Sequence, residues 1–77
     1  MGGKILILED EDAIRSFIRV NLKKQMYETV EAVSGEEALE KIDDTFDIAL
    51  LDVMLPGIDG FEVCRRIREQ YPRLGII

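Results

Sequence analysis

The sequence contains no histidine, one cysteine and few basic residues, and each shortage argues against a class of function. Without histidine, the chain lacks the most common general base and the most common zinc ligand. Cys64 has no partner for an internal disulfide, which favours a reducing compartment such as the cytoplasm. Ten basic residues face sixteen acidic ones, a net charge of −6, so nucleic acid and anionic membrane surfaces are poor partners. The apolar runs are also too short to span a membrane.

The length of 77 residues indicates a single domain over residues 1–77. A chain of this size buries only about 60% of the surface that its unfolded form exposes, so its stability should be marginal. It is too short to hold two domains or a large enzyme with its own substrate cleft.

Short aliphatic segments alternate along the chain with segments of helical periodicity. The aliphatic runs at 5–8, 48–51 and 74–77 predict buried strands, and the weaker β pattern at 27–33 predicts an edge strand. Helices are expected between them, the first with an apolar stripe of Ile14, Phe17, Ile18 and Leu22. The order β-α-β-α-β-α-β indicates an α/β fold with a parallel sheet and right-handed crossovers.

Capping residues predict where each helix begins. Asp12 is expected to cap the first helix, which should end near the basic pair Lys23–Lys24. Ser34 and Glu37 form a capping box for the second helix, and Asp59 and Glu62 form another pair for the third.

Carboxylates follow two of the predicted strands. The acidic run 9–12 comes directly after the first strand, and Asp52 comes directly after the third. If these strands are neighbours, Glu9, Asp10 and Asp52 converge at the carboxyl edge of the sheet, where ligands of such folds bind. Like charges about 4 Å apart repel by about 4 kcal/mol at an effective dielectric near 20, so this cluster predicts a cation. A hard ion such as Mg²⁺ suits an all-carboxylate set.

The other acidic residues of the run have a simpler interpretation. Glu11 and Asp12 lie further from the strand end and fit a solvated turn and a helix cap.

Asp52 could do more than bind the ion. An aspartate beside Mg²⁺ can also accept a phosphoryl group covalently, and this is the chemical role that the pattern suggests for Asp52.

Two motifs resemble those of a known family. The segment 4–11 (KILILEDE) resembles the opening of the receiver domain of bacterial two-component response regulators, and 50–60 (LLDVMLPGIDG) resembles their phosphorylation loop. The residues of the second motif are most similar to those of the transcription-factor subfamily with a winged-helix output domain. The resemblance implies a flavodoxin-like sheet of order 2-1-3-4 and a phosphorylation-controlled switch in signalling.

The resemblance also implies roles for individual residues. Asp52 corresponds to the phosphoacceptor, with a sensor histidine kinase or a small phosphodonor as its partner. Asp10 and Asp52 correspond to direct Mg²⁺ ligands, for which Mn²⁺ can substitute, and the backbone carbonyl of Met54 corresponds to a third ligand. Glu9 corresponds to the acidic residue that reaches the metal through water. Such a domain is a signalling switch in the cytoplasm and not a turnover enzyme.

The resemblance covers four of the five strands and three of the five helices of the family fold. The Ser or Thr and the Lys that the family places near the phosphoryl group would lie beyond Ile77, as would the usual output face. An alternative is therefore a truncated receiver fragment that folds, dimerises or binds metal without efficient phosphotransfer. The uncovered edge of the 74–77 strand and the apolar surface of the first helix also predict a homodimer or strand-mediated self-association.

A metal-dependent phosphatase of the haloacid dehalogenase type is an enzymatic alternative, because it too uses a strand-end aspartate as nucleophile. That family needs a second aspartate two residues later. Met54 stands at this position, which argues against the phosphatase.

Overall fold

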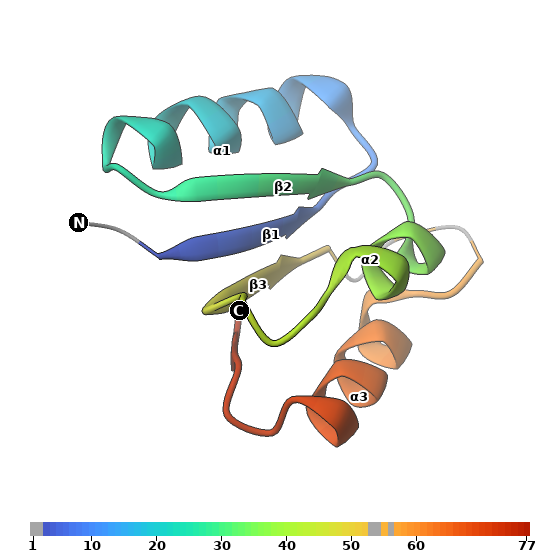
Figure 1. The fold of residues 1–77 in the computed structure, drawn as a ribbon. Coiled ribbons are helices and arrows are strands. Elements are labelled where there is room, and N and C mark those ends of the chain that lie inside the picture. The colour runs from blue at the N-terminus through green and yellow to red at the C-terminus, as the bar shows by residue number, and fades with distance from the viewer. Residues whose placement is uncertain (1–2, 53–54, 56) are drawn as a thin grey trace.

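The computed structural model describes residues 3–52, 55 and 57–77. Its four strands form one parallel sheet in the order β2-β1-β3-β4, which confirms the predicted topology (Figure 1). The strands are β1 (Lys4–Leu8), β2 (Glu28–Ala32), β3 (Ile48–Leu51) and β4 (Gly75–Ile76). The predicted edge position of the second strand is also confirmed, because β2 pairs with β1 alone among the described strands.

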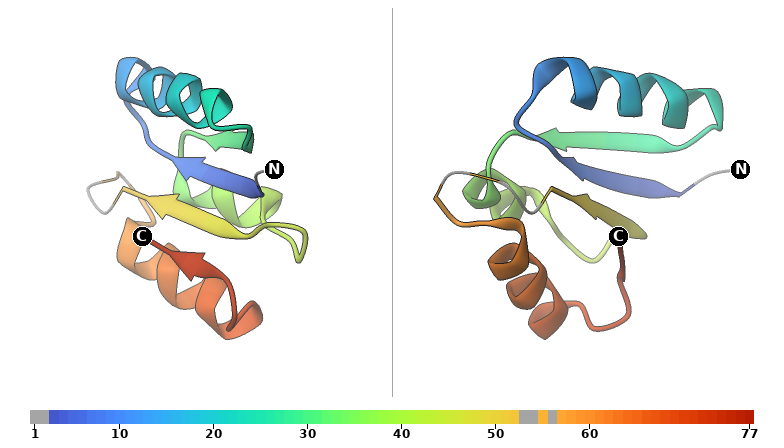
Figure 2. Two further views of the ribbon diagram at one scale, coloured as in Figure 1. Left: turned by 90° about the vertical axis from the view of Figure 1, so that its left-hand side faces the viewer. Right: turned by 180° about the vertical axis from the view of Figure 1, so that it is seen from behind.

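Three helices connect the strands: α1 (Asp12–Lys24), α2 (Gly35–Lys41) and α3 (Gly60–Gln70). Helix α1 packs along β2 and β1, whereas α2 packs on the same two strands and on α3. Figure 2 shows the sheet lying between α1 and α3. Within the described residues no helix is long and apolar enough to cross a membrane.

The main core lies between the sheet and the helices α2 and α3. Alternate residues of β1, Leu6 and Leu8, are almost fully buried in this core. Ile5 and Ile7 alternate with them and therefore face the other side of the sheet, where α1 lies. The remaining buried members of the main core are Ala32, Ala38, Ile42, Phe46, Ala49, Leu55, Val63, Ile67 and Leu74.

Two of the three predicted helix caps are confirmed. The Ser34 hydroxyl accepts a hydrogen bond from the Glu37 amide, and the Asp59 carboxylate accepts one from the Glu62 amide. The prediction for Asp12 is wrong, because Asp12 is the first residue of α1 and Glu11 occupies the cap position without a side-chain bond. The carboxylate of Asp12 is instead engaged by Arg15 one turn along the helix.

The predicted stripe on α1 is only partly covered. Ile18 and Leu22 are half-buried, but Ile14 and Phe17 are 43% and 70% exposed. The expectation of uncovered apolar surface on the first helix is therefore confirmed. The 74–77 strand is shorter than predicted, because Leu74 turns into the core and Gly75–Ile76 alone form β4.

Candidate metal and phosphoacceptor site

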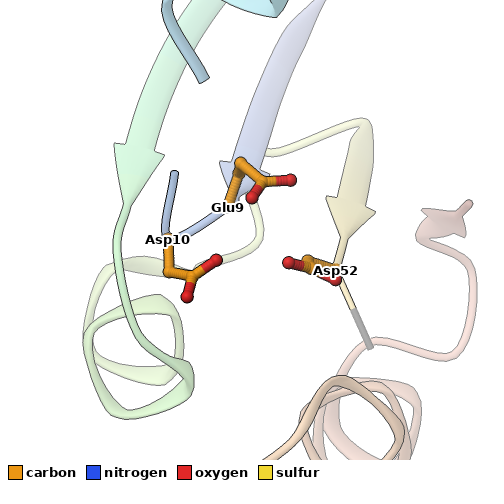
Figure 3. A group of neighbouring side chains, drawn as sticks. All are labelled: Glu9, Asp10 and Asp52. Carbon is orange, nitrogen blue, oxygen red and sulfur yellow. The ribbon is translucent and has the colours of Figure 1, made fainter. Parts of the chain in front are cut away.

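The carboxylates predicted to converge do lie together at the carboxyl edge of the sheet. Because β1 and β3 are parallel neighbours with Leu8 opposite Leu51, the residues that follow them, Glu9 and Asp52, leave the sheet side by side. The Asp52 amide donates to the Leu8 carbonyl at 3.0 Å, which continues the strand pairing up to the site. Figure 3 shows Glu9, Asp10 and Asp52 around one point beyond the two strand ends.

The three side chains are close enough to share one ion. Glu9, Asp10 and Asp52 each offer a carboxylate oxygen, and these oxygens all lie within 4.8 Å of one another. Glu9 and Asp52 are half-buried, whereas Asp10 is exposed. The site is therefore a shallow cluster that is open to an ion or a phosphorylated molecule from solvent. The predicted Met54 carbonyl lies outside the described residues.

The electrostatics of the cluster disfavour three bare negative charges. Burial raises the pKa of Glu9, and the charges of Asp52 and Asp10 raise it further. The Glu11 amide donates to Glu9 Oε2 at 3.1 Å and partly opposes this rise in the pKa. A bound cation would relieve the same repulsion.

The donor set fits a hard divalent cation. All three groups are carboxylates, which are the ligands that Mg²⁺ takes in ones and twos while it keeps several waters. Sulfur and imidazole ligands, which select softer metals, have no part in this cluster. Glu9, Asp10 and Asp52 are thus the residues that would hold Mg²⁺ at this edge of the sheet.

The structure adds one residue that sequence reasoning missed. Arg15 lies on α1, six positions after Glu9, and its Nη1 donates to the Glu9 carbonyl at 2.9 Å. Its Nε also donates to the Glu31 carboxylate on β2 at 3.0 Å. The spacing of Asp12 and Arg15 on one helix was visible in the sequence, but it gave no signal for these two longer-range contacts.

The loop that follows Asp52 leads to helix α3, which begins at Gly60. Gly57 has a φ of +76°, a left-handed conformation that favours glycine at a turn. Leu55 and Gly60 are buried on either side of the turn, so the loop is anchored to the core.

Comparison with known families gives a match over almost the whole chain. The family model described as "Response regulator receiver domain" matches residues 5–77. A match of this extent does not favour the alternative of a fragment that only folds or dimerises.

Two similar proteins are named as transcriptional regulatory proteins. The chain is 51% identical over 65 residues to the transcriptional regulatory protein AfsQ1 of Streptomyces coelicolor, which is 83% of this chain and 29% of that protein. It is 44% identical over 71 residues to the alkaline phosphatase synthesis transcriptional regulatory protein PhoP of Bacillus subtilis, covering 91% of this chain and 30% of PhoP. The chain thus spans less than a third of these relatives. Their names agree with the predicted transcription-factor subfamily.

Solved structures share the fold. The response regulator protein TrrA of Thermotoga maritima, in complex with Mg²⁺ and BeF, has a TM-score of 0.90 and 37% identity, covering 96% of this chain and 65% of TrrA. A second structure holds TrrA in complex with the histidine kinase ThkA, and there the TM-score is 0.89 at the same identity and coverage.

Proposed function

The chain belongs to the response regulator receiver domain family, and we propose on this basis that Asp52 accepts a phosphoryl group in a reaction that needs Mg²⁺. The observation that carries the proposal is the convergence of Glu9, Asp10 and Asp52, with one oxygen of each within 4.8 Å of the others. A half-buried aspartate at a strand end, beside two further acids, combines a nucleophile with the ligands of a cation.

Each residue has a distinct part in this reaction. A carboxylate oxygen of Asp52 attacks phosphorus, and the bond from phosphorus to the donor's nitrogen or oxygen breaks as the acyl phosphate forms. Glu9 and Asp10, with Asp52, would hold the Mg²⁺, Glu9 through water. When bound, the ion neutralises charge on the transferring phosphoryl group. Asp10 is exposed and Asp52 is only half-buried, which lets a donor approach Asp52 from solvent.

The proposed donors are a sensor histidine kinase or a small phosphodonor such as acetyl phosphate. The similarity to TrrA, which has been solved in complex with a histidine kinase, supports the first. The similarity to the TrrA structure with Mg²⁺ and BeF supports the metal, and Mn²⁺ is a proposed substitute because it accepts the same ligands. Each chain would keep its phosphoryl group as a signal, so we propose a cytoplasmic switch and not a turnover enzyme.

We also propose that the chain self-associates. Phe17 on α1 and Ile77 beside β4 are 70% and 79% exposed, and β4 pairs with β3 alone among the described strands. Exposed apolar side chains next to an unpaired strand edge favour contact with a second copy. Light scattering over a concentration series should show the mean mass rising with concentration, and a folded chain that stays monomeric at high micromolar concentration would contradict this proposal.

Phosphorylation is tested by incubation with acetyl phosphate and Mg²⁺, followed by intact mass spectrometry. We expect a gain of one phosphoryl group that EDTA prevents. Asp52→Asn should remove the gain, whereas Asp44→Asn, at an exposed aspartate outside the cluster, should leave it unchanged. Equal labelling of Asp52→Asn would refute the assignment of the acceptor.

A further inference from the structure

Among the arginines and lysines of the described part of the chain, Arg15 donates a hydrogen bond to the backbone of the acidic cluster, at the carbonyl of Glu9. We propose that Arg15 is a positioning residue for the metal site, which holds the peptide between Glu9 and Asp10 in the orientation that lets both side chains face Asp52. This inference rests on the proposed function, because it concerns the same site.

The backbone of Glu9 is held on both of its sides. Its amide donates to the carbonyl of Ala32 at 3.1 Å, which extends the pairing of β1 with β2. Its carbonyl accepts from Arg15 Nη1 at 2.9 Å. At this point β1 leaves the sheet and the chain turns toward α1, so the strand ladder no longer fixes the orientation of the next peptide. The guanidinium replaces the ladder there, and its loss frees the peptide that carries Asp10.

The side chain of Arg15 is itself firmly placed. It is only 13% exposed, and its three nitrogens engage three parts of the fold: the Glu9 carbonyl, the Glu31 carboxylate on β2 and the Asp12 carboxylate on α1. A planar guanidinium can satisfy these three partners at once, whereas a lysine ammonium is a point donor on a flexible stem. The structure therefore predicts that lysine cannot replace Arg15 at this position.

Arg19 provides a matched control on the same helix. Its Nη1 donates to the other oxygen of Glu31 at 3.1 Å, whereas the bond to the Glu9 carbonyl comes from Arg15. Removing Arg19 deletes a cation and an ion pair to β2, as removing Arg15 does, but leaves the bond to the Glu9 carbonyl intact. The loss of a positive charge and of an ion pair between α1 and β2 is therefore common to the Arg15 and Arg19 variants. The loss of the bond that positions Glu9 occurs in the Arg15 variants alone.

The test compares Mg²⁺ affinity by calorimetry in Arg15→Ala, Arg15→Lys and Arg19→Ala, each shown by its NMR spectrum to be folded. Groups that orient metal ligands typically contribute about 10-fold to 100-fold in affinity; because Arg15 acts through backbone, we expect about threefold to tenfold weaker binding for both Arg15 variants. Arg19→Ala should stay within about twofold of wild type. Since affinity is measured on folded chains, a change in global stability alone would not move it.

Two results would overturn the proposal: wild-type affinity in the Arg15 variants, or an equal loss in Arg19→Ala. If Arg15→Ala does not fold, Arg15→Lys decides the matter on the same criterion. If the wild-type chain binds no Mg²⁺, the proposed function fails. The positioning role is then decided by amide hydrogen exchange at Asp10 and Glu11 without metal, which Arg15→Ala should accelerate about tenfold and Arg19→Ala should not.

Discussion

Neutralising one member of the acidic cluster should stabilise the metal-free fold. Asp10→Asn is the most informative change, because Asp10 is the exposed member of the cluster with Glu9 and Asp52. The amide is nearly the same size as the carboxylate, so the substitution removes charge with little change in packing. A site evolved for a cation should therefore gain stability in EDTA when Asp10 loses its charge.

The magnitude follows from the spacing of the oxygens. For two unit charges 4.8 Å apart, the limit within which the three facing oxygens lie, the repulsion is about 0.9 kcal/mol in water and about 3.5 kcal/mol at an effective dielectric of 20. Asp10→Asn removes two such pairs. Because Asp10 is exposed, the water value is the better guide, and the free energy of unfolding should rise by about 1–2 kcal/mol at pH 7.

Urea unfolding followed by circular dichroism measures this change, first in EDTA and then with Mg²⁺. At a Mg²⁺ concentration 20 times the dissociation constant, the wild-type chain should gain about 1.8 kcal/mol. Asp10→Asn should gain less, because one of three carboxylates is gone, so the difference between the two chains should shrink or reverse.

The control is Asp44→Asn, an exposed aspartate outside the cluster, which should change stability by less than about 0.5 kcal/mol in either buffer. The reasoning would be refuted if Asp10→Asn were no more stable than wild type in EDTA, or if Mg²⁺ stabilised both chains equally.

Three other substitutions test the fold. Leu6→Ala empties a fully buried position and should cost about 2–5 kcal/mol in urea unfolding. Gly35→Ala should lower the melting temperature, because the added Cβ would lie 2.7 Å from the backbone oxygen of Ile58. The guanidinium groups of Arg65 and Arg66 lower the pKa of Glu62 to about 2. The ionised Glu62 therefore stabilises the fold above pH 4.5, and this stabilisation is lost as the pH falls toward 2. Glu62→Gln should therefore flatten the loss of stability over this range in acid titration.

The strand order of the sheet and the first residues of α2 and α3 could be predicted from the sequence. The patterns that indicate them are either local or follow from the parallel topology. The aliphatic runs of β1 and β3 mark buried parallel strands, and parallel pairing then brings the ends of both strands to one edge. Ser34 and Asp59 cap their helices through amides three residues away, a contact that the sequence spacing contains directly.

The cap of α1 could not be located from local spacing. Four acidic residues follow one another at 9–12, and several of them could serve as a cap. The point at which β1 leaves the sheet places Glu11 in the cap position, and Arg15 draws the Asp12 carboxylate into an ion pair instead. The ion pair with Arg15 thus decides which of these acidic residues caps the helix, and this ion pair is visible only in the folded chain.

The approach of Arg15 to the site also lay beyond sequence reasoning. Glu31 is sixteen residues away, and the bond to Glu9 is made to a backbone carbonyl, which any residue type provides. By contrast, the cluster of Glu9, Asp10 and Asp52 was predictable, because three carboxylates at two strand ends are a chemical pattern as well as a topological one.

The measurement that tests the central claim most directly is the location of the phosphoryl group after reaction with acetyl phosphate and Mg²⁺. Reduction of an acyl phosphate with borohydride converts the phosphorylated aspartate to homoserine, which peptide mass spectrometry can place in the sequence. The account predicts homoserine at Asp52 alone, and none when EDTA is present. Homoserine at another acidic residue, or none at Asp52 in a folded chain that binds Mg²⁺, would contradict it.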